Sequence, residues 1–354
     1  MQNDTAIEVN LDKKKYGKSI GDIVKIKSDF FNHNEDMLRL SAHQADALLL
    51  QKKREKCKIC EKPISGEPLY HSQRMDYYLC PVCGHLNSAY EDTEDFAERV
   101  YLSDNYENNY SEEDRMRYRQ RMESIYLPKA SFLIGKLEED GLEKGEISIL
   151  DDGAGSGYFV SALKHLGIKA RGIEISGPQV EFANRMAGES ILEQVDSGRI
   201  PQIIRETGVN TVTLIGVLEH VIDLHSLLTA IKDNTAIRYI FLSVPLFSFS
   251  CIFEASHQHC YNRHAGGTHT HLFSDSSLKY MAEGIGFEET ASWKFGSDMM
   301  DLYRMISVSL DQSGNPKLRE YFEGKFLPIL DELQLVVDKS EFASETHLLL
   351  RRKA

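Results

Sequence analysis

The stretch ISILDDGAGSGYFVSALKHLGIKARGIEISGPQVEFAN, residues 147–184, decides the fold of this 354-residue chain. Its first four residues are apolar and are followed by aspartates, which predicts a short buried strand at 147–150. A glycine-rich turn follows at 151–157, and residues 158–166 have helical spacing of apolar side chains. A second strand is predicted at 170–175. This order of elements is a βαβ unit, and it predicts a ligand site at the carboxyl ends of two parallel strands.

The glycine spacing distinguishes between two kinds of nucleotide site. Glycine lets the backbone approach a ligand where a Cβ would clash. Glu174 lies 23 residues after Asp151, close to the spacing at which an acidic residue binds ribose hydroxyls. A dinucleotide fingerprint reads G-x-G-x-x-G, whereas this turn reads Gly153-x-Gly155-x-Gly157. The pattern therefore argues against a dinucleotide site. The alternative to a nucleoside site is a glycine turn that binds no ligand.

The run D-x-G-x-G-x-G, with an acidic end on the following strand, resembles motif I of the class I S-adenosylmethionine (SAM) methyltransferases. The resemblance implies an α/β fold with a Rossmann-like seven-stranded sheet and SAM as cofactor. It also implies that the turn holds the methionine part, that Asp151 orders the turn, and that Glu174 binds the ribose. Asp196, after a third strand predicted at 190–195, is the candidate for adenine. The expected cofactor-binding residues are Asp151, Gly153, Ala154, Gly155, Gly157, Glu174, Ile175, Asp196, Gly216 and Val217.

Composition limits the classes of partner and location. The chain has 41 basic and 54 acidic residues, and its formal net charge of -13 disfavours extensive contact with nucleic-acid phosphates. No apolar run approaches the roughly 20 residues that a membrane span needs. The N-terminal sequence MQNDTAIEVNLDKKK lacks the apolar core of a signal peptide. We therefore expect a cytoplasmic protein with no membrane span, and nucleic acid is not an expected partner.

Four of the six cysteines form two C-x-x-C pairs. Cys57 and Cys60 are followed, after nineteen residues, by Cys80 and Cys83. Two such pairs fit a tetrahedral four-thiolate site for structural Zn²⁺, with iron as the main competitor. Because so small a module has little core, metal binding should supply folding energy. His85 is expected to be a neighbour of this site and not a ligand.

These features divide the chain into four parts. Three tyrosines at 101, 106 and 110, between the cysteine module and the βαβ unit, are interpreted either as an interdomain surface or as part of a lid over SAM and the acceptor. The parts are an N-terminal helical and extended segment at 1–56, a zinc-ribbon-like module at 57–90, a helical lid or linker at 91–140, and the SAM-binding methyltransferase domain at 141–354.

The later strands and helices of the methyltransferase domain are predicted from the pattern of apolar residues. Strands are predicted at 212–215 and 239–244, around Trp293, and at 345–351. An amphipathic helical region at 315–339 would then divide the last two strands. Ser274 is predicted to cap a helix that begins after it.

A second motif follows the predicted strand at 212–215. The run Val217-Leu218-Glu219-His220-Val221 resembles the segment after strand four of many SAM methyltransferases. The resemblance implies that Gly216 to His220 form the floor of the active site. His220 is a candidate general base because an unperturbed imidazole has a pKa near about 6.5. Alternatively, Glu219 and His220 only brace the loop.

A histidine-rich segment lies downstream, and three interpretations of it remain open. It is a metal site, since imidazole and thiolate are good ligands, or it recognises the acceptor and transfers a proton, or it forms surface loops. We favour the second. The candidate catalytic residues, in order, are His220, His271 and His269. The segment contains His257, His259, Cys260, His264, His269 and His271.

From Glu91 onward the chain looks like methyltransferases that modify sugars and surface polysaccharides. The cysteine module is similar to the zinc-binding N-terminal part of sugar C-methyltransferases, but the extra C-terminal domain of those enzymes is not seen after the core. The resemblance therefore implies O-, N- or C-methylation of a small acceptor such as a sugar or sugar nucleotide. Two alternatives remain: an RNA or DNA methyltransferase gripping its substrate through the zinc module, and an inactive SAM-binding interaction protein.

Overall fold

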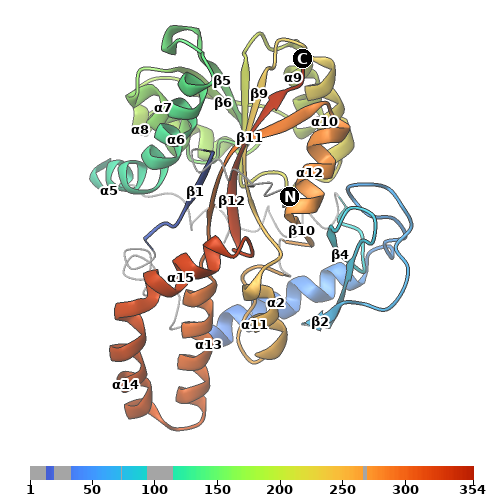
Figure 1. Ribbon diagram of the computed structural model, residues 1–354, viewed down its shortest axis with the longest axis vertical. Coiled ribbons are helices and arrows are strands. Elements are labelled where there is room, and N and C mark those ends of the chain that lie inside the picture. The colour runs from blue at the N-terminus through green and yellow to red at the C-terminus, as the bar shows by residue number, and fades with distance from the viewer. Residues whose placement is uncertain (1–12, 20–32, 73, 94–114, 266–268) are drawn as a thin grey trace, which may run out of the picture.

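The computed structural model describes residues 13–19, 33–72, 74–93, 115–265 and 269–354 (Figure 1). Its largest element is an eight-stranded sheet in the order β1-β11-β12-β9-β8-β5-β6-β7. All neighbours in this sheet are parallel except β12, which runs antiparallel to both β9 and β11. The strands are β1 (Lys14–Tyr16), β5 (Ser148–Asp152), β6 (Lys169–Glu174), β7 (Leu192–Gln194), β8 (Thr211–Ile215), β9 (Tyr239–Pro245), β11 (Phe287–Phe295) and β12 (Glu345–Arg352).

The predicted α/β fold with seven strands is confirmed, and β1 is an addition at the edge that the sequence did not indicate. Its residues, Lys-Lys-Tyr, carry no apolar alternation, so nothing local marks them as a strand. The segment is held instead by contacts with β11. The indole Nε1 of Trp293 donates to the Gly17 carbonyl at 2.9 Å, and the Lys15 ammonium lies 3.5 Å from the Trp293 ring centroid.

Helices cover both faces of the sheet, which gives three layers (Figure 1). On one face, α6 (Leu127–Glu139) and α7 (Tyr158–His165) share a buried apolar cluster with β9, β11 and β12. On the other face, α9 (Ile200–Glu206), α10 (Leu224–Asp233) and α12 (Asp275–Gly284) pack in a second cluster, which also contains the four paired cysteines. As predicted, Ser274 caps α12, accepting from the Ser277 amide at 3.2 Å. The helix α8 (Gly177–Ala187) packs beside β7.

A helical insertion separates β11 from β12 and projects away from the sheet (Figure 1). It consists of α13 (Asp298–Gln312), α14 (Pro316–Phe326), a 3₁₀ turn η5 (Leu327–Ile329) and α15 (Leu330–Lys339). The sequence predicted the insertion but placed its start at residue 315. The missed helix α13 contains Asp298, Asp301 and Arg304, all buried, and charged residues at such positions obscure an apolar helical face.

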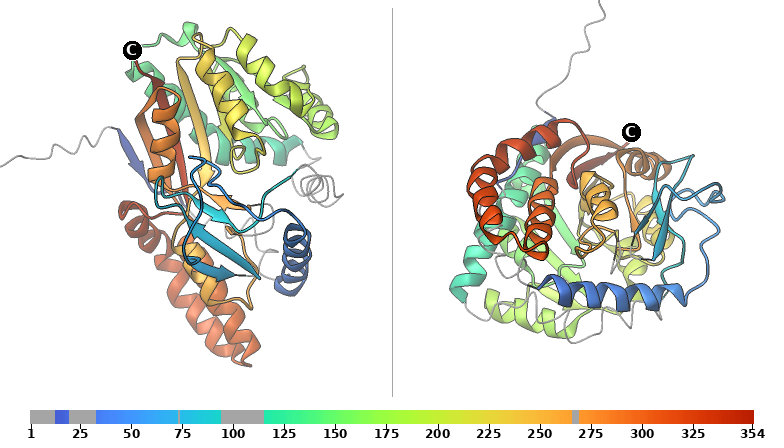
Figure 2. Two further views of the ribbon diagram at one scale, coloured as in Figure 1. Left: turned by 90° about the vertical axis from the view of Figure 1, so that its right-hand side faces the viewer. Right: turned by 90° about the horizontal axis from the view of Figure 1, so that it is seen from below.

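The cysteine module is joined to the methyltransferase domain by a shared sheet. The four strands are ordered β10-β4-β3-β2, and β10 (His271–Leu272) comes from the histidine-rich segment. The other three are β2 (Tyr70–Ser72), β3 (Met75–Leu79) and β4 (Leu86–Ser88). The preceding helix α2 (Asn34–Leu49) lies near the module, and β2 packs against α11 (Phe249–Ser256) (Figure 2).

Among the described residues, none of the helices has both the length and the apolar content needed to cross a bilayer.

Candidate active site and cysteine cluster

The glycine turn joins β5 to α7 at the edge where the parallel strands end. Gly157, just before α7, has φ of +72°, and a Cβ there would lie 2.8 Å from the Ala183 Cβ. Gly153 has φ of +67°, and its Cβ would meet a methyl group of Val217 at 2.6 Å. Glycine is therefore required at both positions by the backbone conformation and by neighbours within the protein. Close approach of a ligand is thus not the sole reason for glycine at these positions.

Glu174 stands at the end of β6, next to this turn. Its carboxylate accepts hydrogen bonds from the amides of Gly155 at 2.8 Å, Ile175 at 2.8 Å and Ser176 at 3.0 Å. These bonds fix the carboxylate that the sequence predicts as the ribose ligand. The Ile175 side chain beside it is 53% exposed, which leaves an apolar surface open for a flat ring. Asp196, the adenine candidate, is exposed and follows β7, whose end is tied to β6 by the Val195 amide and the Glu174 carbonyl at 3.0 Å.

Buried charge surrounds the turn. Asp151 accepts from the Thr213 hydroxyl at 2.5 Å, and burial raises its pKa to about 7. Burial and the nearby Glu174 also raise the pKa of Asp152 to about 7. On α6, burial lowers the pKa of the Lys129 amine to about 8. The excess of carboxylates complements a ligand that carries a sulfonium and an ammonium group.

Sequence reasoning singled out Asp151 but missed Asp152 and Lys129. For Asp152 the available signal was its place as the last residue before the glycine turn. For Lys129 it was a cation next to the apolar run of the helical pattern at 127–139, which also contains Lys136. The second of these signals is weak, because a lysine stem commonly packs along a helix while its ammonium reaches water.

One tyrosine of the predicted lid segment contacts the turn directly. Tyr118 on α5 (Arg115–Arg121) stacks on Tyr158 with ring centroids 4.3 Å apart. Its hydroxyl lies 3.1 Å from the Ser156 carbonyl and 3.0 Å from the Ser161 hydroxyl. A π-helical turn, η2 (Met122–Tyr126), then leads into α6. The tyrosines at 101, 106 and 110 lie outside the described residues.

The floor of the site is formed by the segment after β8. Glu219 is buried, and burial raises its pKa to about 8. The imidazole rings of His220 and His269 are stacked with centroids 5.2 Å apart. One carboxylate oxygen of Glu219 and one nitrogen of each histidine lie within 4.8 Å of one another. Burial lowers the pKa of His269 to about 4, so this ring is neutral near pH 7. Tertiary structure thus brings together two of the three predicted catalytic histidines.

The third, His271, is bonded to the cysteine module. Its Nδ1 lies 2.9 Å from Nε2 of His85, and burial holds the pKa of both rings well below the ordinary histidine value. The Ser277 hydroxyl donates to the Ser274 carbonyl at 3.0 Å, so it accepts from His85 Nδ1 at 3.4 Å. In a neutral imidazole the other nitrogen is then an acceptor.

These bonds determine the tautomer of His271. Because His85 Nε2 accepts, His271 Nδ1 must be the donor, and its Nε2 carries a lone pair. That Nε2 is buried and has no hydrogen-bond partner among the described residues. It is therefore an acceptor without a donor, as a proton-accepting group in a site without bound substrate would be.

The other histidines and the cysteine of the histidine-rich segment lie either at the surface or in the interior. His257 is partly buried, and the exposed His259 contacts the Ser309 hydroxyl at 2.8 Å. His264 is buried and its Nε2 lies 2.9 Å from Asp301. Cys260 is also buried.

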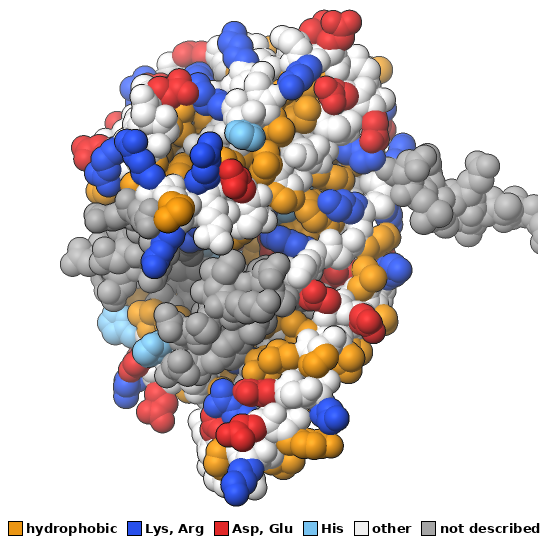
Figure 3. Space-filling view, turned by 90° about the vertical axis from the view of Figure 1, so that its left-hand side faces the viewer, with side chains coloured by type: hydrophobic (Ala, Val, Ile, Leu, Met, Phe, Trp, Pro, Cys, Tyr) orange, Lys and Arg blue, Asp and Glu red, His pale blue; other side chains and the backbone are white. Residues whose placement is uncertain are grey.

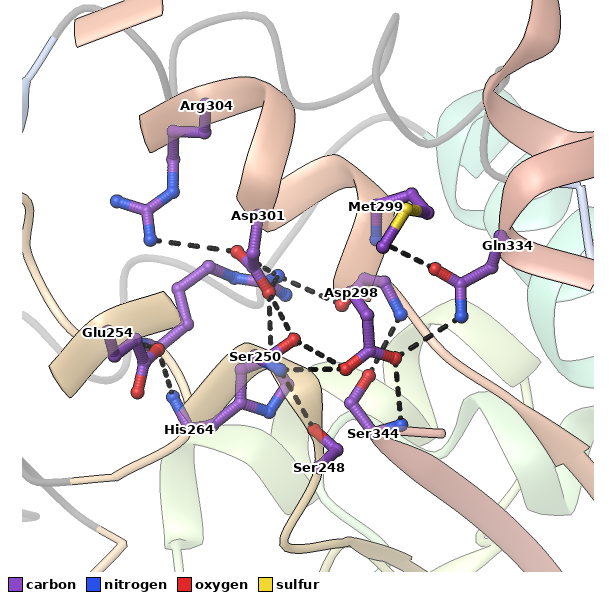
Figure 4. A network of polar contacts seen from close by, with 12 residues as sticks. Ser248, Ser250, Glu254, His264, Asp298, Met299, Asp301, Arg304, Gln334 and Ser344 are labelled. Atoms are coloured by element: carbon purple, nitrogen blue, oxygen red, sulfur yellow. Dashed lines mark hydrogen bonds and ion pairs between the residues drawn. The ribbon is translucent and has the colours of Figure 1, made fainter. Parts of the chain in front are cut away.

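His264 belongs to a polar network that joins α11, α13 and α15 beneath this segment (Figure 4). Glu254 accepts from the His264 amide at 2.9 Å and from the Ala265 amide at 3.1 Å. Arg263 pairs with Asp301 at 3.0 Å. Burial alone would raise the pKa of Asp301, but Arg263 and His264 hold it well below the usual range. The network fixes the backbone a few residues before His269.

The four paired cysteines are buried and their sulfurs lie within 4.8 Å of one another. Two of the separations are 3.6 Å, between Cys57 and Cys83, and 3.4 Å, between Cys60 and Cys80. Sulfurs at about 2.3 Å from a tetrahedral ion would be about 3.8 Å apart, so the donor set fits such an ion. The Asn87 amide donates to the Cys57 sulfur at 3.5 Å, which is the kind of outer contact that orients a metal ligand.

The order of the seven core strands, the glycine turn and the acidic end of β6 together define a Rossmann-like methyltransferase domain. Residues 118–292 match the family model described as a methyltransferase domain. The chain is a SAM-dependent methyltransferase. No curated protein sequence matches it at a significant level.

Many solved structures are similar to the chain, at low sequence identity. Magnesium protoporphyrin IX methyltransferase from Synechocystis PCC 6803, with bound SAH, is 13% identical, with 64% of this chain and 83% of that chain covered and a TM-score of 0.42. A SAM-dependent methyltransferase from Archaeoglobus fulgidus is 16% identical, with coverage of 63% and 94% and a TM-score of 0.39. A putative sarcosine dimethylglycine methyltransferase from Galdieria sulphuraria is 13% identical, with coverage of 64% and 85% and a TM-score of 0.41.

Proposed function

We propose that the enzyme transfers the methyl group of SAM to a small acceptor, a sugar or sugar-nucleotide-like compound, with a histidine of the site floor taking the acceptor's proton. The observation that carries this proposal is the group of Glu219, His220 and His269, whose donor atoms lie within 4.8 Å of one another after β8. Val217, two residues before Glu219, contacts the glycine turn at Gly153, so the floor adjoins the cofactor turn.

The cofactor's parts fit the residues at this edge of the sheet. Glu174 would bind the ribose, the turn from Gly153 to Gly157 the methionine part, and Ile175 the adenine face. Asp151 and Asp152 supply negative charge for the sulfonium and ammonium groups. Gly216 and Val217 would close the pocket from the β8 side, and Asp196 would approach adenine from β7.

The reaction that we propose is an in-line displacement. A hydroxyl or amine of the acceptor forms a bond to the methyl carbon while the bond from that carbon to sulfur breaks, and S-adenosylhomocysteine (SAH) leaves. The acceptor's proton passes to an imidazole nitrogen and then to solvent. Because the sulfonium is already activated, positioning and exclusion of water supply much of the acceleration. His220, His271 and His269 are the candidate bases.

We also propose that Cys57, Cys60, Cys80 and Cys83 hold structural Zn²⁺. A closed set of four thiolates leaves no open position for a substrate. When bound, the ion would stabilise the two loops that carry the cysteines, and through β4 it would support the strand β10 that begins with His271.

The charges of the cysteine module argue against a nucleic-acid grip. Lys56 and Lys62 are exposed beside the cysteines. Arg54 and Lys58 both pair with Asp92, and their side chains are buried. They are therefore not available to phosphates. Figure 3 shows the side of the molecule opposite to the cysteine module, where basic and acidic side chains of the described residues are interspersed.

The first test is of the cofactor site. Calorimetric titration of the protein with SAH should show binding, and Glu174→Gln should weaken it about 10-fold or more, because the amide cannot accept from the same three donors as strongly. Glu193→Gln, an exposed neighbour on β7, is the matched control and should leave the affinity unchanged. Absence of heat with SAH would overturn the proposal.

The second test is of the acceptor. Methyl-labelled SAM is incubated with sugars, sugar nucleotides, small amines and total RNA, and transfer of label is measured. We expect label in a sugar or sugar nucleotide. Label in RNA alone would support the nucleic-acid alternative. Replacing His220, His269 and His271 singly by Ala should lower kcat at saturating acceptor for whichever histidine takes the proton.

A further inference from the structure

We propose that Glu219, His220 and His269 form a second metal site, one that binds a first-row divalent cation such as Zn²⁺ or Mn²⁺ within the active site. The inference deepens the proposed function and rests on it for its chemical role. The site is separate from the four cysteines and differs from them in donor type. Its ligands are one carboxylate oxygen and two imidazole nitrogens, within 4.8 Å of one another.

The strongest observation is an unsatisfied carboxylate oxygen. Glu219 is only 4% exposed, and its Oε2 has no hydrogen-bond partner among the described residues. A buried carboxyl oxygen without a partner loses the hydrogen bonds that it would make in water, which is unfavourable. A divalent cation would satisfy this oxygen. Glu345 and Lys129 also act on Glu219, and their opposite charges partly offset each other there.

The set of donors indicates the class of ion. Two imidazoles and one carboxylate suit zinc, iron and manganese, whereas calcium and magnesium prefer oxygen ligands alone. Three protein ligands also leave open coordination positions, as in catalytic metal sites, unlike the closed set of four cysteines.

The position of the site suggests what the cation binds. The segment that holds Glu219 and His220 adjoins the glycine turn through Val217, and the amide of Gly216 is anchored to the Ser243 carbonyl at 2.8 Å. A cation there would take the acceptor's oxygen in an open position. Coordination lowers the pKa of a bound hydroxyl, so the oxygen could lose its proton more easily before it attacks the methyl group. The proton released in this step passes to solvent.

The experiment counts metal ions per chain. The purified protein is dialysed to equilibrium against Zn²⁺, and separately against Mn²⁺, and its metal content is measured by mass spectrometry. We expect two zinc ions per wild-type chain. Glu219→Gln and His269→Ala should each retain one, because the cysteine site is intact. His165→Ala, at the exposed end of α7, is the matched histidine control and should retain two.

SAH titration of the same samples tests folding and the proposed function independently. A variant that keeps one zinc ion and wild-type SAH affinity is folded and has lost only the second site. The inference is overturned if the wild type holds a single zinc ion that the substitution Cys60→Ser removes, or if Glu219→Gln and His269→Ala both keep two. If SAH fails to bind to the wild type, the proposed function fails, whatever the metal count.

Discussion

His85 Nε2 accepts a hydrogen bond from His271 Nδ1 across 2.9 Å, and this bond joins the cysteine module to one of the candidate catalytic residues. His85 follows the second C-x-x-C pair, and His271 begins the strand β10, so the two residues are 186 positions apart in sequence. The bond determines which nitrogen of His271 carries the lone pair. The module thus contacts His271 in two ways, through the His85 imidazole and through the pairing of β4 with β10.

Removing this bond should lower turnover. We expect His85→Ala to reduce kcat about 10-fold, the value of one hydrogen bond of roughly 1.4 kcal/mol, because His271 loses the acceptor that orients it. His271→Ala should cost more, about 10²-fold or above, if His271 takes the proton. His71→Ala, an exposed histidine of the same module, is the control. Equal kcat in all three variants and the wild type would show that the pair has no role in catalysis.

Two glycines allow the stability cost of backbone strain to be distinguished from the cost of steric overlap. Gly157 and Gly188 have nearly the same φ, +72° and +73°, but nothing lies within 4 Å of a Cβ at Gly188. Gly188→Ala should therefore cost about 1 kcal/mol of unfolding free energy, from the left-handed backbone alone. Gly157→Ala should cost at least ~2 kcal/mol, because its Cβ also overlaps Ala183. Urea denaturation of both variants measures the difference; equal losses would contradict the packing around the turn.

SAM binding should release protons near pH 7. The pKa of Asp151 and that of Asp152 are both raised to about 7. A cationic ligand favours the ionised carboxylates, so protons leave when SAM binds, and affinity should increase as the pH rises through about 7. Calorimetry in two buffers of different ionisation enthalpy measures the release. SAH lacks the sulfonium charge and should release fewer protons; identical values for the two ligands would contradict this account.

Asp301 should stabilise the fold in a pH-dependent way. Asp301→Asn leaves Arg263 and His264 without their buried partner, and we expect a loss of about 3–5 kcal/mol at pH 7. Because Arg263 and His264 hold the folded-state pKa below the unfolded value, the contribution is present above about pH 4 and lost as the pH falls below it. The gap between wild type and variant should therefore narrow near about pH 3. Asp311→Asn, at the exposed end of α13, should cost less than about 1 kcal/mol at either pH.

Loss of the zinc ion proposed for the four cysteines should affect methyl transfer as well as stability. Cys60→Ser, or treatment with a strong chelator, should lower the melting temperature and the turnover together, because β4 pairs with β10 and the Ser88 amide donates to the Thr270 carbonyl at 3.0 Å. Chelator presaturated with zinc is the control. Undiminished turnover after complete removal of zinc would separate the module from the active site.

Local sequence was sufficient for the centre of the methyltransferase sheet because β5, β8 and β9 each contain a short apolar run. Residues 147–175 predicted β5, the glycine turn, α7 and β6, and the structure contains each of them. The two C-x-x-C pairs were equally visible, and the structure brings their sulfurs together. The roles of Asp301 and Lys129 could not be predicted from the sequence. A charged residue within a helical pattern is expected to be solvent-exposed unless its distant partners are known.

The sequence by itself determined the class of enzyme, since the turn from Asp151 to Gly157 and the acidic end of the next strand are encoded within about thirty consecutive residues. Only the tertiary structure decided how the histidines are divided. His220 and His269 meet Glu219, while His271 is bonded to His85, and their separations in sequence give no hint of either arrangement. The physical reason is that these contacts are made between side chains on different loops, which the packing of β10 against the cysteine module brings together.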